Sequence, residues 1–452
     1  MYSINAFCKK TTVFLLLVLL SFLPLSPAYG QAKDGAASGS GAGWRDDAIT
    51  LKVAVIGPGN ELYFWWGHIG LVVEDEITGR ARFFDWGVFS FENENFFVNF
   101  AYGRLIYTCA VTPAELNFNE FIRTNRDVTL YTLDLPDAGK KAILRYAENN
   151  MLPENRDYAY HHFKDNCATR IRDILDLGLG GQFKAKFGEA PGRYTLRQHV
   201  MRHTWFNPFF DWILNFWMGQ DIDRPTTVWE EMFLPSEIAL RIKDFQYTDS
   251  DGNQRPLVKS VEVVNKSHGR PVVLDKAPVQ WPRNLVVSLV FSGLILFVYI
   301  RRGRHRDFKI FIGLLQSLLG LFFGAAGSIL FFMTFFTNHD YTYHNSNIIF
   351  VNPIFFAAIP LGIILAFTKI DKKYLSAVRI SKVFWTYIFL GDLLTMVIKI
   401  FPGFYQQNQD TQVLLMPAAL VMIFIYARLG LFNFFGSTTK VDAASGKIRK
   451  RS

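Results

Sequence analysis

Two apolar regions of the chain differ in pattern from the long stretch that separates them. Near the N-terminus, residues 13–20 are continuously apolar, and from 285 to 436 apolar runs alternate with short polar loops. Between these regions, apolar and polar residues are mixed as in a globular domain. This stretch of about 250 residues is long enough to bury one sizeable core. The pattern therefore predicts a globular domain joined to a membrane domain.

The first half of the globular stretch is typical of a β-rich fold. Short segments rich in β-branched and aromatic residues are bounded by turn residues. The turn signal Thr78-Gly79 separates two such segments, so we expect a hairpin that carries His68 on one strand and Asp85 on the other. The predicted strands are 49–56, 68–74, 81–91, 105–111 and 128–135.

Helices are predicted in the second half of this stretch. A helix over 138–150 ends before Pro153, and a helix over 167–177 is stopped by Gly178 and Gly180. A third predicted helix, 193–216, is rich in aromatic residues, and 247–282 is typical of a β-rich connector.

The C-terminal region contains five apolar runs that we interpret as membrane-spanning helices. A span needs about 20 mostly apolar residues to cross a hydrocarbon core of about 30 Å. The shorter runs therefore depend on flanking residues such as Trp281. The predicted spans are 285–300, 310–336, 353–367, 383–400 and 413–429.

The charge of the loops predicts the orientation of these spans. Segments 301–309, 369–382 and 440–452 each contain five Lys or Arg residues and one acidic residue, whereas 338–352 and 402–412 contain no Lys or Arg. Basic loops remain in the cytoplasm, so we expect the C-terminus inside and the globular domain outside. The net charge of +9 is concentrated in these loops, which argues against nucleic acid as a partner.

The N-terminal segment has the layout of a secretory signal peptide. Lys9 and Lys10 precede the apolar run, and the small-residue site 28–30 follows it. A retained membrane anchor is the alternative, and both interpretations export the globular domain. The sequence thus predicts a bacterial inner-membrane protein with these parts: signal peptide 1–30, flexible leader 31–47, catalytic domain 48–220, connector 221–282, transmembrane domain 283–436 and cytoplasmic tail 437–452.

Cys167 is a candidate nucleophile. Asp165 and Asn166 are good N-cap residues, so they place Cys167 in the first turn of a helix. The N-terminus of a helix stabilises anions, including the thiolate form of cysteine. Two alternatives stay open: Cys167 is an inert buried cysteine, or it forms a disulfide with Cys109.

His68 and Asp85 are the candidate partners of that thiolate. A cysteine nucleophile needs a base and a group that orients the base. His68 lies between two glycines, and Asp85 lies among aromatic residues, where burial without a partner is costly. The alternatives are a core histidine and a turn or edge aspartate. No Cys/His spacing matches a zinc site, so we expect no metal and no other cofactor.

Other polar residues are candidates for substrate contacts. Arg170 has the chemistry to hold a phospholipid phosphate, although a solvated helix face is an equal alternative. His339 and Asn347 lie in a polar loop between two predicted spans and are candidates to line a lipid site, or they belong to an ordinary connection. Asp392 is a charge within a predicted span and is therefore a suspected functional residue, or it pairs with a polar group of a neighbouring span.

Four motifs resemble the Lnb-type lipoprotein N-acyltransferases. The block 165–170, Asp-Asn-Cys-Ala-Thr-Arg, is the most specific, and the loop around His339 is also similar. The resemblance implies an α+β fold of the permuted NlpC/P60 (papain-like) type in the periplasm, followed by an all-α bundle of five transmembrane helices. The other three motifs are Trp-Gly-His at 66–68, Phe-Asp-Trp-Gly at 84–87 and Asn-Arg-Asp-Tyr at 155–158.

The resemblance also implies a reaction and residue roles. Cys167 would be the nucleophile, His68 the base and Asp85 the orienting residue. Cys167 would take an acyl chain from a phospholipid as a thioester and pass it to the amine of a diacylglyceryl-cysteine lipoprotein. The candidate substrate-binding residues are Asn166, Arg170, Tyr160, Trp66, His339 and Asn347.

Two other functions remain open from the sequence alone. The first is a hydrolase of the same fold, either a peptidoglycan amidase or endopeptidase or a phospholipase. The aromatic run 63–66 and the predicted spans favour a lipid substrate over peptidoglycan. The second is a membrane scaffold or sensor without catalysis, which predicts no reactive thiol at Cys167.

Overall fold

The computed structural model describes residues 48–89, 95–303 and 305–436, which form two compact units. The sheet unit contains the described residues up to Pro208 together with Arg224–Ala277. The helical unit contains Phe209–Asp223 and the described residues from Pro278 onward. The predicted signal peptide, the flexible leader and the cytoplasmic tail lie outside the described residues.

This division differs from the predicted domains in two places. The predicted connector 221–282 is largely part of the sheet unit, because its strand β9 (Val258–Asn265) pairs with a strand of the main sheet. Residues 209–220 were expected in the catalytic domain and 221–223 in the connector, but all of them belong to the helical unit. Their apolar side chains Trp212, Ile213 and Phe216 pack into the core of that unit.

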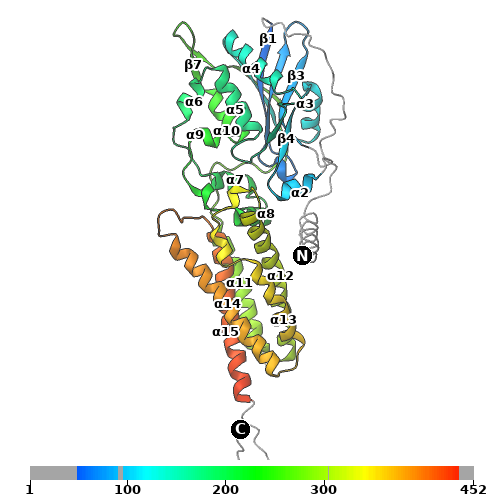
Figure 1. Ribbon diagram of the computed structural model, residues 1–452, viewed down its shortest axis with the longest axis vertical. Helices are drawn as coiled ribbons and strands as arrows, with labels where there is room; N and C mark the ends of the chain where they lie inside the picture. Colours follow the sequence, from blue (N-terminus) through cyan, green and yellow to red (C-terminus); the bar gives the residue numbers. More distant parts are fainter. Residues whose placement is uncertain (1–47, 90–94, 304, 437–452) are drawn as a thin grey trace, which may run out of the picture. The chain divides into compact units, whose positions relative to one another are not determined.

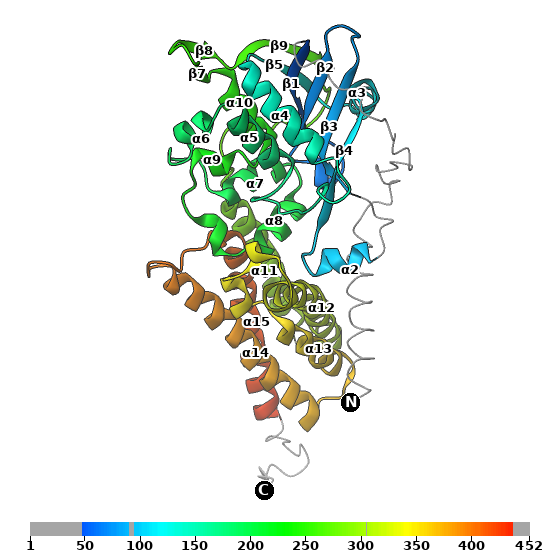
Figure 2. The same cartoon turned by 45° about the horizontal axis from the view of Figure 1, so that its top comes forward.

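The main feature of the sheet unit is an antiparallel sheet of seven strands among the described residues. Figure 2 shows the strands side by side. Successive side chains of a strand point to opposite faces, and both faces are covered: Leu51 and Val53 of β1 lie in one core, and Ala54 and Ile56 lie in the other. In spatial order the strands are β6 (Asp157–Ala159), β4 (Ile106–Pro113), β3 (Ala81–Val88), β2 (His68–Asp75), β1 (Ile49–Ile56), β5 (Val128–Leu133) and β9.

Helices cover both faces of this sheet (Figure 1). On one face lie α4 (Asp137–Asn149), α5 (Cys167–Gly178) and α10 (Pro235–Lys243), which contribute apolar side chains to the larger core. On the other face lies α3 (Ala114–Arg123), which buries Phe121. The smaller elements are η1 (Leu62–Phe64), α2 (Phe96–Ala101), α6 (Gln182–Phe187), α7 (Leu196–Thr204), α9 (Val228–Glu231) and the hairpin of β7 (Gln246–Thr248) and β8 (Gln254–Pro256).

The predicted helix 193–216 is wrong as a single element. The structure has two helices here, α7 and α8 (Pro208–Trp217). Proline disfavours helical geometry in the residue before it and cannot donate a backbone hydrogen bond, so Pro208 begins a new helix instead of continuing the first. The two helices also belong to different units.

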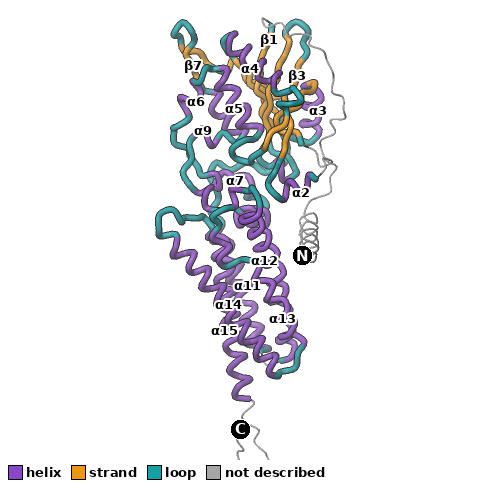
Figure 3. The backbone as a smooth tube through the Cα atoms, in the orientation of Figure 1, coloured by secondary structure: helices purple, strands orange, loops and turns teal. Residues whose placement is uncertain are grey.

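The helical unit contains five segments that are long and apolar enough to span a membrane, among the described residues. Figure 3 shows these helices and the strands of the sheet unit in separate colours. Four spans are single helices, while the third combines the turns η4 (Ser346–Ile349) and η5 (Pro353–Ala357) with α13 (Ala358–Phe367). The chain is therefore a multi-pass membrane protein. The single helices are α11 (Trp281–Arg302), α12 (Arg306–Phe336), α14 (Lys372–Ile398) and α15 (Gln409–Gly436).

Candidate active site

Cys167 is the first residue of α5, as the capping signal predicts. The side-chain oxygen of Asn166 accepts hydrogen bonds from the backbone N–H groups of Ala168 and Thr169, each at 2.9 Å. The Thr169 hydroxyl in turn accepts a bond from the Asn166 backbone at 2.8 Å, which completes a capping box. Because Ile171 and neighbouring apolar residues anchor α5 in the core, Cys167 is held at a rigid helix N-terminus.

His68 and Asp85 meet across the β2–β3 hairpin. Leu71 pairs with Phe84 in this hairpin, a register that brings the beginning of β2 beside the end of β3. His68 Nε2 lies 3.0 Å from Asp85 Oδ1, and the same oxygen accepts a hydrogen bond from the Gly87 backbone at 2.6 Å. The carboxylate therefore has two donors that fix its position, and it in turn fixes the imidazole.

Two glycines allow this close arrangement. A Cβ atom on Gly87 would lie 2.6 Å from His68 Cε1, so any side chain there would displace the imidazole. Gly67 has a φ of +80°, and a Cβ on it would lie 2.7 Å from the carbonyl oxygen of Ile56. The absence of side chains at both positions is thus a requirement of the His68 geometry.

Electrostatics link all three side chains. Burial lowers the pKa of His68, but the charges of Asp85 and Cys167, and hydrogen bonds with both, outweigh it and raise the pKa to about 10. Burial would raise the pKa of Asp85, but His68 and the Gly87 backbone lower it overall. His68 is therefore an imidazolium that bonds to a carboxylate and to the sulfur of Cys167. A cysteine beside an imidazolium can supply both a nucleophile and a proton donor.

The two cysteines of the sheet unit are both free. The alternative of a disulfide between Cys109 and Cys167 is therefore wrong. Cys109 is buried in β4, where its sulfur contacts that of Met151 at 3.6 Å, and burial raises the pKa of its thiol. Cys109 has the features of a core residue, whereas Cys167 is partly accessible.

Comparison with known families identifies the domain that contains this site. Residues 45–201 match the model of the Lnb N-terminal periplasmic domain. The chain carries an Lnb-type periplasmic domain. The match includes Cys167, His68 and Asp85, and the family suggests a membrane enzyme that modifies lipoproteins. No curated protein and no solved structure matches the chain, so the NlpC/P60-like topology of the Lnb-type domain stays a prediction.

Aromatic rings form one wall beside the site of the Lnb-type domain. Tyr107 on β4 stacks on Tyr160 with ring centroids 4.0 Å apart and on Phe89 at 5.0 Å. Burial, followed by the charge of Cys167, raises the pKa of Tyr107, which identifies this ring as a neighbour of the sulfur. Sequence patterns named Tyr160 but missed Tyr107. Its position depends on the pairing of β4 with β6, which only the fold reveals.

The aromatic wall continues to a surface helix. Phe89 stacks on Phe96 at 6.0 Å, and Phe96 begins the short helix α2. Two further rings of that helix are largely exposed, Phe97 at 38% and Phe100 at 47%. A continuous series of apolar side chains thus joins the neighbourhood of Cys167 to the surface of the Lnb-type domain.

Three predicted substrate-binding residues of the Lnb-type domain have contacts within it. Asn166 uses its amide group to donate to the carbonyls of His162 and Phe233, at 2.8 and 3.0 Å, and its role in substrate binding stays a prediction. Arg170 forms a two-bond ion pair with Asp165 at 2.6 and 2.7 Å, and its role as a phosphate ligand stays a prediction. Trp66 has a buried indole N–H without a hydrogen-bond partner among the described residues.

The remaining two candidates lie in the helical unit. The amide of Asn347 is fully buried, donates to the carbonyl of Phe216 at 2.9 Å and accepts from Asn408 at 2.7 Å. The ring of His339 bonds to the hydroxyl of Tyr341 at 2.9 Å. Asn347 therefore connects segments of its own unit, and His339 bonds within its own loop.

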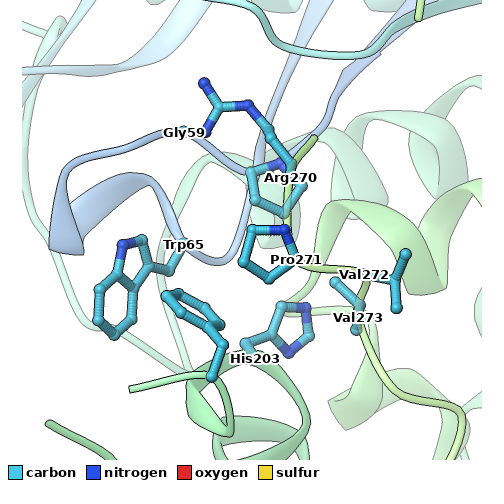
Figure 4. A pocket seen from close by; sticks show the side chains of 9 residues that line it. Gly59, Trp65, His203, Arg270, Pro271, Val272 and Val273 are labelled. Carbon is cyan, nitrogen blue, oxygen red and sulfur yellow. The ribbon is translucent and has the colours of Figure 1, made fainter. Parts of the chain in front are cut away.

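The described residues contain no group of three or more His, Cys, Asp or Glu side chains that could hold a metal ion. A separate hollow of the sheet unit is lined by Trp65, Phe206 and the segment from Arg270 to Val273 (Figure 4). His203 in its wall is neutral, because burial lowers its pKa to about 3. This hollow contains none of the three candidate catalytic residues.

Proposed function

We propose that this protein is a lipoprotein N-acyltransferase. Cys167 accepts an acyl chain from a phospholipid as a thioester and transfers it to the N-terminal amine of a diacylglyceryl-cysteine lipoprotein. The observation that carries this proposal is the Cys167–His68–Asp85 arrangement within an Lnb-type domain of a membrane-spanning chain.

The first half of the proposed reaction forms the thioester. The Cys167 thiolate attacks the ester carbonyl of the phospholipid and forms a tetrahedral oxyanion. The oxyanion collapses as the bond to the glycerol oxygen breaks, and the His68 imidazolium gives its proton to that oxygen. The products are a lysophospholipid and an acyl-Cys167 thioester, with His68 neutral and still oriented by Asp85.

The second half transfers the acyl chain to nitrogen. The neutral α-amine of the lipoprotein attacks the thioester carbonyl, and His68 accepts a proton from the amine. The carbon–sulfur bond then breaks, which leaves an amide on the lipoprotein and restores the thiolate–imidazolium pair. Thioesters react readily with amines, and an apolar site limits competing hydrolysis by water.

Two features favour a lipid substrate over peptidoglycan. The aromatic wall through Tyr107 and Phe89 offers apolar surface to an acyl chain beside the sulfur. The same chain provides five candidate membrane spans, so a lipid substrate and the enzyme are both located in the membrane. A peptidoglycan amidase would need a polar cleft instead.

The proposal is tested by following a labelled acyl chain. Full-length protein in nanodiscs would receive a phospholipid with a deuterated acyl chain and a diacylglyceryl lipopeptide with a free amine. We expect the heavy acyl chain on the lipopeptide amine, as seen by mass spectrometry. Cys167→Ser should abolish the transfer, whereas Cys109→Ala, which removes the other thiol of the sheet unit, should retain it.

Each other result of that experiment has a defined meaning. Release of heavy fatty acid without an amide would indicate a phospholipase. The acceptor itself carries two acyl esters, so an amide made only with unlabelled chains would contradict a phospholipid donor while leaving the cysteine mechanism intact. An amide formed equally well by Cys167→Ser would contradict the mechanism itself.

A further inference from the structure

Arg126 lies at the end of the sheet where His68 begins β2. In the sheet, Ile56 of β1 pairs with both His68 and Val128, so the residues just before Val128 lie at this end. Arg126 Nε donates to the carbonyl of Gly57 at 2.9 Å, and the Gly57 N–H donates to the carbonyl of Asp127 at 2.9 Å. These bonds fix the base of the Arg126 side chain beside the loop that leads to His68.

The guanidinium group of Arg126 is enclosed by two aromatic rings. Its central carbon lies 4.5 Å from the centroid of the Phe64 ring and 5.4 Å from that of Phe121. The Phe121 ring in turn lies 6.3 Å from the imidazole of His68. Only 2% of Arg126 is exposed. The guanidinium is therefore held in one position next to the site.

Arg126 differs from comparable buried arginines of the same unit because it has no ion pair within the described part of the chain. Arg172 contacts Asp173 at 2.8 Å, and Arg202 contacts Glu237 at 3.2 Å. The Nη2 atom of Arg126 is buried and has no hydrogen-bond partner among the described residues. A buried guanidinium N–H without an acceptor is unfavourable, so such a group indicates an acceptor that arrives with a ligand.

The electrostatic environment of Arg126 agrees with a position near Cys167. Burial and the neighbouring Arg270 lower the pKa of Arg126 to about 10, while the charges of Cys167, Glu61 and Asp85 oppose that shift. The group is thus still cationic at neutral pH and within electrostatic reach of the sulfur and of the carboxylate that orients His68.

A purely structural role of Arg126 does not explain why its Nη2 atom has no acceptor among the described residues. The bond to Gly57 accounts for Nε alone. The adjacent loops are held by a different residue, Arg270, which donates to the carbonyl of Asn125 and to the side chain of Asn60 at 2.8 Å. Arg270 therefore provides a matched comparison: it supports the same loops, and its charged neighbours are Glu61 and Asp127.

We propose that Arg126 forms an anion subsite, in which Nη2 donates a hydrogen bond to an anionic oxygen of the lipid substrate at Cys167. This inference rests on the proposed acyl transfer. Two oxygens have the required chemistry: the oxyanion of the tetrahedral intermediate and the phosphate of the phospholipid. Both present a localised negative charge, for which a charge-assisted bond to a rigid guanidinium is well suited.

The first test does not depend on acyl transfer. In full-length protein, Cys167 would be alkylated with iodoacetate, which is anionic, and with iodoacetamide, which is neutral. An anion subsite raises the iodoacetate rate relative to the iodoacetamide rate. We expect Arg126→Met to lower that ratio by about tenfold or more, since a charge-assisted hydrogen bond is lost. Arg270→Met should leave the ratio unchanged.

The result that overturns the proposal is an unchanged ratio in a folded Arg126→Met protein, with folding checked by thermal unfolding. An equal fall of the ratio in Arg270→Met would also overturn it, because loop support would then explain the effect. If Arg126→Met does not fold, Arg126→Gln is used instead, because its side-chain amide can still donate to the Gly57 carbonyl. The ratio of the two alkylation rates is then judged in the same way.

The second test distinguishes the two oxygens. The rate of Cys167 acylation would be measured with a phospholipid and with the matching diacylglycerol, which has the same esters but no phosphate. An equal loss with both donors in Arg126→Met assigns Arg126 to the oxyanion, and a larger loss with the phospholipid assigns it to the phosphate. If wild-type protein shows no acylation at all, the proposed function fails, while the alkylation ratio still decides whether the anion subsite exists.

Discussion

At the scale of single residues, the site depends on how closely His68 is surrounded. Asp85 lies on one side of the imidazole, and Gly87 leaves room for its Cε1 atom. The sulfur of Cys167 is the remaining partner. Because the three groups lie close together and are only partly accessible, small displacements of His68 should have large effects on the reactivity of the thiol.

Substitution of Gly87 tests this dependence. In Gly87→Ala the new methyl group overlaps with the His68 ring, so the ring must move away from Asp85. We expect a loss of stability of about 1–3 kcal/mol from overpacking and a fall of at least tenfold in the alkylation rate of Cys167. Gly79→Ala in the β2–β3 turn strains a residue with φ of +68° without touching His68, and it should lose stability while keeping thiol reactivity.

The raised pKa of His68 predicts a pH dependence of stability. The pKa in the folded protein, about 10, is above the ordinary value of 6.5, so the charged form stabilises the fold. This contribution is complete below pH 6.5 and disappears as the pH rises toward 10. The difference in melting temperature between wild type and His68→Gln should therefore shrink between pH 6.5 and 10. A difference that grows over this window would contradict the assignment of an imidazolium.

Sequence patterns predicted the Cys167, His68 and Asp85 candidates because each lies in a local motif with its own physical signal. Arg126 and Tyr107 were missed for the opposite reason. Arg126 approaches His68 through the pairing of β5 with β1, and Tyr107 approaches Cys167 through the placement of β4. The local sequence around either residue does not predict these contacts between distant parts of the chain.

At the scale of elements, the N-terminus of α5 positions the sulfur. Asn166 bonds to the first turn of the helix and, through its amide, to the carbonyl of Phe233. The cap therefore fixes both the start of the helix and its attachment to a distant segment. The sequence predicted the cap from Asp165 and Asn166, but it could not predict the attachment.

Removal of this cap should affect stability and reactivity together. Asn166→Ala loses the cap, which costs about 1 kcal/mol, and leaves the Phe233 carbonyl without its donor. Thr195→Ala removes an equivalent capping box from α7, so it should cost a similar amount. Thermal unfolding and iodoacetamide labelling would be compared. Only Asn166→Ala should slow labelling of Cys167, and equal labelling in both variants would show that the cap does not position the sulfur.

The elements that the sequence placed incorrectly share a physical cause. The break before Pro208 and the entry of β9 into the main sheet both depend on which core a segment joins. Periodicity reports that a segment has an apolar face but does not report its partner. The boundary between domains was therefore less predictable than the helices and strands within them.

At the scale of the whole molecule, the chain combines an Lnb-type domain with five candidate membrane spans. The apolar runs predicted these spans well, because a hydrocarbon core imposes a minimum length on any crossing helix. Orientation follows from a different signal, the distribution of basic residues among the loops. The two signals are independent, so the orientation can be tested separately from the fold.

Cysteine labelling tests the predicted orientation. In a Cys167→Ala background, Asn338→Cys places a thiol in a loop without Lys or Arg, and Lys372→Cys places one in a basic loop. Both positions are exposed. In spheroplasts, an impermeant maleimide should label the thiol at position 338 directly and the thiol at 372 only after permeabilisation. The reverse pattern would place the C-terminus outside the cell.

The most direct test of the central claim is the mass of full-length protein after incubation with phospholipid. We predict an adduct of one acyl chain on Cys167 that disappears when a diacylglyceryl lipopeptide with a free amine is added, and that does not form in His68→Ala. A wild-type protein without any adduct, or an adduct that persists in Cys167→Ser, would contradict the account.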